Sequence, residues 1–134
     1  MSGLPVIFAM NTITLIYLMN SVLLIVHEVD SAYWKEWELF RLPGGLDGFL
    51  LLHIPLVGLI MYGLLEVAAG SLVGMYIYLV VNVGGFFAYA IHTYFIRKGD
   101  ERFNGSVSQG LLYAILVVSL IQLLHAASRH GLLG

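Results

Sequence analysis

The chain has 134 residues, of which 60% are apolar and 10% charged, and its mean hydropathy is +0.91. Soluble domains carry roughly 25% charged residues, so this composition excludes a water-soluble enzyme. The net charge of -2 leaves no basic face for a phosphate backbone and argues against nucleic acid as a partner. Because the chain has no cysteine, disulfides, iron–sulfur clusters and thiol catalysis are excluded as well.

Four apolar runs follow one another along the chain. They extend over residues 5–26, 49–65, 72–96 and 107–124. Each is close to the roughly 20 residues that cross hydrocarbon as a helix, and the alternation typical of barrel strands is absent. We predict a single all-α domain over 1–134, an integral membrane four-helix bundle with helices at 5–29, 47–67, 71–97 and 106–128. Residues 1–4 carry no Lys or Arg, so we expect no signal peptide and a retained first helix.

A polar and aromatic segment, residues 30–42, separates the first two runs. It contains both tryptophans, and Tyr33, Trp37 and Phe40 recur at helical spacing. Aromatic side chains gather at the headgroup layer, so a short interfacial helix is expected between helices one and two. A Pro-Gly-Gly sequence then ends this segment and turns the chain back.

Five of the six basic residues fall on one side of the predicted bundle. They lie in the first and third loops and are Lys35, Arg41, Arg97, Lys98 and Arg102. By the positive-inside rule these loops face the cytoplasm and both termini lie outside it. We therefore expect a multi-pass protein of the bacterial inner membrane, in contact with membrane lipids.

Ionisable side chains near the cytoplasmic ends of three helices form the candidate site. His27 ends the first helix, whereas His53 and His92 lie roughly 9 Å and 7.5 Å into the second and third at about 1.5 Å per residue. Asp30 shares a helix face with His27, and Glu28 is adjacent to it in sequence. Because a charged group in a crossing costs at least about 2.5–3.5 kcal/mol, such residues are functional candidates by default.

Imidazoles together with carboxylates suit zinc or non-haem iron, so the sequence predicts a divalent metal site. The candidate metal ligands are His27, Asp30, His53 and His92. The candidate catalytic groups, which would act as acid or base, are Glu28 and Glu38. A catalytic ion also needs an open coordination position. The expected use is a membrane-embedded enzyme that acts on a lipophilic substrate.

Four alternatives remain open. The histidines can be boundary residues that hydrogen-bond to neighbouring helices, or His53 and His92 can hold a haem, although no haem attachment motif is present. A homo-oligomer can transport protons or cations along a path that uses Glu66, Asn20, Asn82 and the histidines. Asn20 and Asn82 can instead join helices by hydrogen bonds. A non-catalytic accessory subunit, packed through its glycines, is the fourth alternative.

Residues 27–38 resemble small bacterial integral membrane families of unknown function that carry a histidine–acid signature at the end of the first helix. The segment is also loosely similar to the HXXEE membrane family, in which a paired acid follows a histidine and further histidines occur in later helices. Here Asp30 comes three residues after His27 and Ser31 follows it, so the paired acid is incomplete. The resemblance extends from His27 to about His53 and implies a histidine and acid site without a defined reaction.

Overall fold

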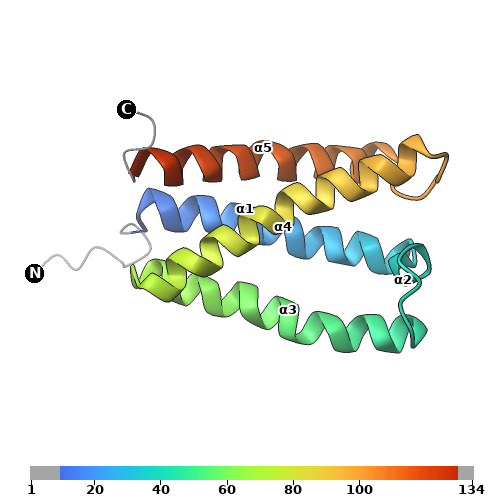
Figure 1. Cartoon of the computed structure of the whole chain (residues 1–134), viewed down its shortest axis with the longest axis horizontal. Coiled ribbons are helices and arrows are strands. Elements are labelled where there is room, and N and C mark those ends of the chain that lie inside the picture. Colours follow the sequence, from blue (N-terminus) through green and yellow to red (C-terminus); the bar gives the residue numbers. More distant parts are fainter. Residues whose placement is uncertain (1–9, 130–134) are drawn as a thin grey trace, which may run out of the picture.

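The computed structural model describes residues 10–129, and these form five helices and no β-strand (Figure 1). The helices are α1 (Thr12–Tyr33), α2 (Glu36–Leu39), α3 (Gly45–Ala68), α4 (Leu72–Arg97) and α5 (Ser106–Arg129). All of them except α2 are long and apolar enough to cross a membrane. The predicted all-α fold is therefore confirmed, and four of its helices have the length and composition of membrane spans.

The first helix begins later than predicted. The Asn11 side chain caps α1 by accepting a hydrogen bond from the Thr14 amide at 3.0 Å, so the described part of the helix begins at Thr12. An N-cap residue has extended backbone and cannot itself continue the helix. The predicted helix start at residue 5 and the stretch up to residue 9 lie outside the described residues.

The first helix also ends later than predicted, at Tyr33 instead of 29. Ser31, which the sequence places in the interfacial segment, is completely buried and continues the helix against the core. The interfacial helix itself is reduced to the four residues of α2. Left-handed backbone at Lys35, with φ 55°, and at Arg41, with φ 54°, interrupts the helical conformation on both sides of it.

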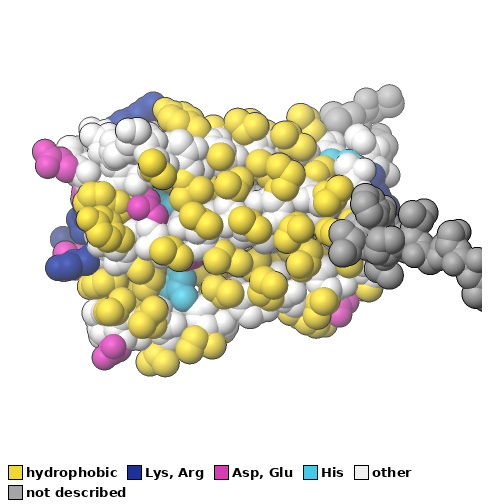
Figure 2. Space-filling model, turned by 180° about the vertical axis from the view of Figure 1, so that it is seen from behind, with side chains coloured by type: hydrophobic (Ala, Val, Ile, Leu, Met, Phe, Trp, Pro, Cys, Tyr) yellow, Lys and Arg dark blue, Asp and Glu magenta, His cyan; other side chains and the backbone are white. Residues whose placement is uncertain are grey.

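The four long helices run up and down, so that α2 and the α4–α5 connection lie at one end of the bundle (Figure 1). The α3–α4 turn, the start of α1 and the end of α5 lie at the opposite end. From that turn α3 and α4 diverge toward the α2 end, and α1 packs against both of them and against α5. Hydrophobic side chains cover the middle of the face in Figure 2, and most charged side chains gather at its two ends.

Buried amide and hydroxyl side chains join the helices in the middle of the bundle. The Gln122 Oε1 atom accepts a hydrogen bond from Asn20 Nδ2 at 2.6 Å, and Gln122 Nε2 donates to the Tyr78 carbonyl at 2.7 Å. The Tyr78 hydroxyl donates in return to the Gln122 carbonyl at 3.0 Å, and Asn82 Nδ2 donates to the Ser119 carbonyl at 2.7 Å. The sequence suggested that Asn20 and Asn82 bond the first and third membrane helices to each other, but both side chains bond to α5 instead.

Replacing Gln122 by leucine should destabilise the bundle by roughly 1–2 kcal/mol, because the variant removes the acceptor of Asn20 and the donor to Tyr78 at a fully buried position. The measurement is the SDS fraction at the unfolding midpoint in mixed micelles. Ser128→Leu, at an exposed position of the same helix, is the matched control. Equal midpoints for the two variants would mean that this hydrogen-bond network contributes nothing to stability.

Candidate metal site and adjoining cavity

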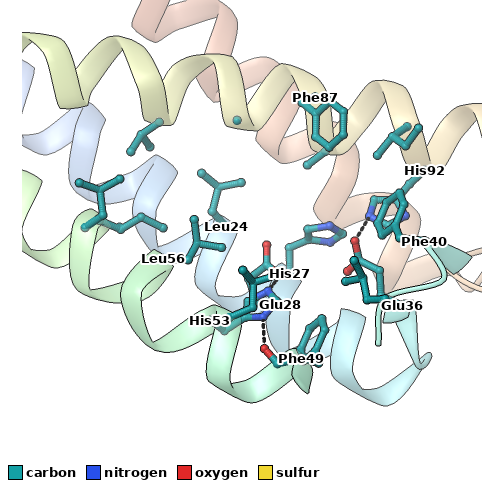
Figure 3. A pocket seen from close by; sticks show the side chains of 18 of the residues that line it. Leu24, His27, Glu28, Glu36, Phe40, Phe49, His53, Leu56, Phe87 and His92 are labelled. Atoms are coloured by element: carbon teal, nitrogen blue, oxygen red, sulfur yellow. Dashed lines mark hydrogen bonds and ion pairs between the residues drawn. The ribbon is translucent and has the colours of Figure 1, made fainter. Parts of the chain in front are cut away.

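Two histidines and one glutamate from three helices converge at the α2 end of the bundle (Figure 3). His27 on α1 and His92 on α4 are only 2% and 1% exposed, and their ring centroids lie 4.6 Å apart. Glu36 on α2 completes the group, with one ligand atom of each residue within 4.8 Å of the others. A single ion that binds each ligand at about 2.0–2.2 Å can bridge such a group after small side-chain rotations.

Glu36 reaches this position because the chain turns sharply after α1. The left-handed Lys35 separates α1 from α2, so the first residue of α2 lies over the end of the bundle. Aromatic contacts hold α2 there, since the Trp37 ring lies 5.6 Å from that of Phe49 and the Phe40 ring 6.0 Å from that of Phe95. Burial raises the pKa of the Glu36 carboxyl to about 7. A neighbouring cation would favour the ionised carboxylate.

Each residue of this group has a buried polar atom without a hydrogen-bond partner among the described residues. The atoms are His27 Nδ1, His92 Nδ1 and Glu36 Oε2. Buried polar atoms are nearly always paired, and an unpaired one costs about 1–3 kcal/mol. The other nitrogen of the His92 ring, Nε2, lies 3.6 Å from Glu36 Oε1, so this group holds more buried polar atoms than partners among the described residues.

Phe103, in the connection between α4 and α5, closes the site from the side of α5. It is 1% exposed, and its ring centroid lies 4.1 Å from that of His92 and 5.9 Å from that of His27. Its backbone has φ 64°, a left-handed conformation that is uncommon for an aromatic residue. Phe103 thus packs against both imidazoles, and nothing in the sequence indicated this contact.

Glu28 and His53 form a separate pair on the same cavity. The His53 Nδ1 atom lies 2.6 Å from the Phe49 carbonyl oxygen, which can only accept, so Nδ1 carries a hydrogen. The Nε2 atom of the same ring lies 2.7 Å from Glu28 Oε2. A hydrogen bond between these two atoms requires one shared proton, either as imidazolium with carboxylate or as imidazole with carboxylic acid. Both forms are neutral overall, which lowers the cost of burial.

The structure thus brings together only part of the predicted ligand set. His27 and His92 are adjacent, whereas both nitrogens of His53 are engaged by Phe49 and Glu28. Asp30 lies outside the group of three within the described part of the chain, and Glu36 was not among the predicted ligands. The haem alternative is not favoured, because His53 Nε2 faces Glu28 and not His92.

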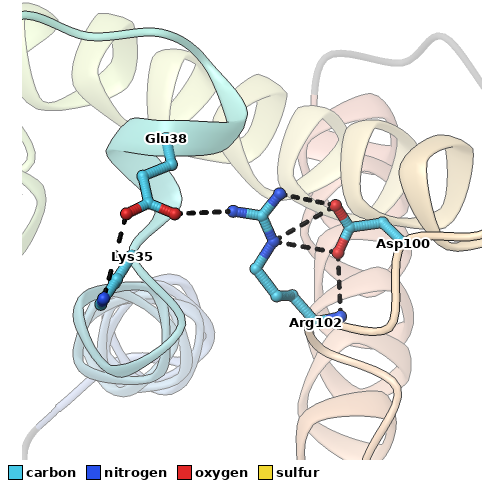
Figure 4. A network of polar contacts seen from close by, with 4 residues as sticks. All are labelled: Lys35, Glu38, Asp100 and Arg102. Carbon is cyan, nitrogen blue, oxygen red and sulfur yellow. Dashed lines mark hydrogen bonds and ion pairs between the residues drawn. The ribbon is translucent and has the colours of Figure 1, made fainter.

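Glu38, the second predicted catalytic residue, lies in a network on the outside of the bundle (Figure 4). Its carboxylate is 3.7 Å from the Arg102 guanidinium and 4.0 Å from the Lys35 ammonium, and it does not line the cavity. Arg102 also binds Asp100 at 2.7 Å, and this hydrogen bonding lowers the pKa of the Asp100 carboxyl. The network therefore connects α2 to the α4–α5 connection without entering the site.

A cavity of about 340 Å³ adjoins the three residues, and α1, α3 and α4 form its walls (Figure 3). Its polar lining is confined to five side chains near α2, which are His27, Glu28, Glu36, His53 and His92. The remaining lining is aliphatic or aromatic apart from Gly84. Such a volume is at the lower end of small-molecule sites, which measure about 300–1,000 Å³ and combine an apolar wall with a few polar groups.

The cavity opens sideways between α3 and α4. Leu52 on α3 and Val80 and Phe87 on α4 line it, yet all three side chains are exposed on the outside of the bundle. Because α3 and α4 are membrane-spanning helices, their exposed apolar side chains face hydrocarbon. The opening thus connects the apolar outer face of α3 and α4 to the polar end of the cavity.

The model of a family of unknown function, DUF6713, matches residues 13–129, and the chain belongs to this family. The match includes every residue of the site and of the cavity lining. No curated protein and no solved structure matches the chain. The resemblance to a family of unknown function is confirmed to this extent.

Proposed function

We propose that this protein binds one divalent metal ion through His27, Glu36 and His92, as the centre of a membrane-embedded enzyme that acts on a lipophilic substrate. The observation that supports this is the approach of three ligand atoms to within 4.8 Å in a buried position. Two imidazoles and one carboxylate are the ligand composition of hydrolytic zinc sites and of non-haem iron sites that keep positions open. The adjoining apolar cavity would place a substrate beside such an open position.

Glu28 and His53 would move the proton in such a reaction. When bound, a divalent ion supplies a Lewis acid and activates an oxygen ligand. The shared proton between Glu28 Oε2 and His53 Nε2 lies on the same cavity, so the pair can donate it to a substrate oxygen or take one up. Glu28 therefore keeps the catalytic role that the sequence predicts, and Glu38 has no part in this proposal.

The direct test is metal titration of the purified protein in detergent after treatment with a chelator. We expect saturable binding of about one Zn²⁺ per chain, and Co²⁺ should give the visible absorption bands of a site with nitrogen and oxygen ligands. Fe²⁺ under anaerobic conditions is the second ion to test, because the same ligand set suits it. Absence of saturable binding for all three ions, with the helical circular dichroism intact, would refute the proposal.

The proposed location is the bacterial inner membrane, with the site end in the cytoplasm. Five of the six basic residues lie at the α2 end, four of them in connections and Arg97 at the end of α4, and this is the end that contains the site. The histidine–acid sequence at the end of α1 is compatible with the bacterial families that it resembles. Because positive charge is retained on the cytoplasmic side, the α3–α4 turn and the end of α5 would face the periplasm.

Single cysteines should reveal this orientation, since the chain has none of its own. Glu101→Cys lies at the site end and Ser128→Cys at the opposite end, and both positions are exposed. In intact spheroplasts, a membrane-impermeant maleimide should label Ser128→Cys but should label Glu101→Cys only after lysis. The reverse pattern would show that the site faces away from the cytoplasm.

A further inference from the structure

We infer that the cavity binds a single-chain amphiphile with an anionic oxygen headgroup, with the headgroup at the metal ion and the chain between α3 and α4. The ligand class rests on the proposed function, because the ion determines the sign of the charge at the polar end. Four features of the cavity lead to it, namely its length, its direction, its opening and its charge.

The dimensions of the cavity fit one hydrocarbon chain. Val80 and His92 both line it and lie 12 residues apart on α4, which is roughly 18 Å along the helix axis. A volume of about 340 Å³ spread over that length makes the cavity elongated along α4. One extended hydrocarbon chain fits along it.

The direction of the cavity matches that of a lipid in the adjacent leaflet. Its polar end lies next to α2, at the end of the bundle, and its apolar part extends along Leu24 and Leu56 toward the middle of the membrane (Figure 3). Since the opening faces hydrocarbon, an amphiphile can slide in sideways with its headgroup already at the correct depth. An amphiphile from the adjacent leaflet can therefore bind in the same orientation that it has in the bilayer.

The net charge at the polar end of the cavity determines which headgroup of an amphiphile can bind there. Neutral His27 and His92, ionised Glu36 and a divalent ion together carry one positive charge, and the Glu28 and His53 pair is neutral and holds a proton. No lysine or arginine lines the cavity within the described part of the chain. Hydrocarbon tails are as apolar as the cavity wall, so chain burial contributes little and the headgroup decides affinity. A carboxylate, or another oxygen anion, complements this site.

The first test uses the wild-type protein in phosphatidylcholine nanodiscs and a dodecanoate probe with a photoreactive diazirine at its chain end. With Zn²⁺ bound, the probe should label α3 and α4 near Ile60 and Val81, and unlabelled dodecanoate should compete on the order of tenfold better than dodecyltrimethylammonium. Removal of Zn²⁺ by a chelator should lower labelling by a similar factor. Equal competition by the two amphiphiles would overturn the inference.

The second test fills the cavity. Gly84 lines it on α4, and a Cβ added there meets no atom within 4 Å, so the side chain of Gly84→Leu would occupy the channel. Gly58→Leu on α3 is the matched control, because it also has open space but does not line the cavity. Labelling should fall on the order of tenfold in Gly84→Leu and remain at the wild-type level in Gly58→Leu.

Zinc stoichiometry, measured on the same samples, separates the two hypotheses. Full zinc binding with unchanged labelling in Gly84→Leu would overturn the amphiphile site and leave the metal site in place. Absence of zinc binding in the wild type would overturn the metal site itself. If Gly84→Leu does not fold, the competition between dodecanoate and dodecyltrimethylammonium in the wild type still tests the amphiphile site.

Discussion

Replacing His92 by alanine should weaken Zn²⁺ binding by more than about 100-fold, whereas replacing His53 by alanine should change it by less than about tenfold. His92 belongs to the group whose ligand atoms lie within 4.8 Å of one another. Both nitrogens of His53, by contrast, already have partners at 2.6 Å and 2.7 Å. The two variants remove the same side chain from the same cavity, so each is a control for the other. Competition with a chromophoric chelator measures the affinities.

The carboxylates extend this test. Glu36→Gln should weaken binding in the same way as His92→Ala, because it removes the negative ligand and keeps the side-chain volume. Asp30→Asn should have little effect, since Asp30 lies outside the group among the described residues. If His53→Ala and Asp30→Asn lost the metal while Glu36→Gln kept it, the ligand set predicted from the sequence would be correct and the one proposed here wrong.

Replacing Gly74 by alanine should destabilise the protein by about 3 kcal/mol. A Cβ on Gly74 would lie 2.4 Å from the Glu66 carbonyl oxygen and 2.6 Å from the Val67 amide nitrogen. These are backbone atoms, so the contact is relieved only if α3 and α4 move apart. The Ser71 side chain, which accepts from the Gly74 amide at 2.9 Å and donates to Glu66, fixes the turn further.

Gly58→Ala is the control for Gly74→Ala. Both glycines lie within membrane helices, but a Cβ on Gly58 meets no atom within 4 Å. Since alanine is the better helix former, Gly58→Ala should be neutral or stabilise by up to about 1 kcal/mol. Unfolding in mixed micelles of increasing SDS content compares the two. A Gly74→Ala midpoint as high as that of Gly58→Ala would show that the turn opens without cost.

Hydropathy alone determined the number and the order of the long apolar helices in the described part of the chain. In hydrocarbon every apolar run of sufficient length must form a helix, so the runs led directly to α1, α3, α4 and α5. Spacing along the chain also placed His27 and His92 at similar depth, and the structure brings them together. Depth follows from counting residues from a loop, and that count needs no tertiary information.

Only the tertiary structure decided which side chains meet. The direction in which a side chain points changes by about 100° from one residue to the next, so His53 at a similar depth faces Glu28 and not the other histidines. Glu36 joins them because Lys35, a residue that carries no turn signal, takes a left-handed conformation. Phe103 contacts the histidines from the connection between α4 and α5, which no sequence pattern indicated. The cavity lies between α3 and α4, which diverge from the turn that joins them. Helix rotation, the turn at Lys35 and helix divergence depend on packing between segments, which hydropathy along a single chain does not encode.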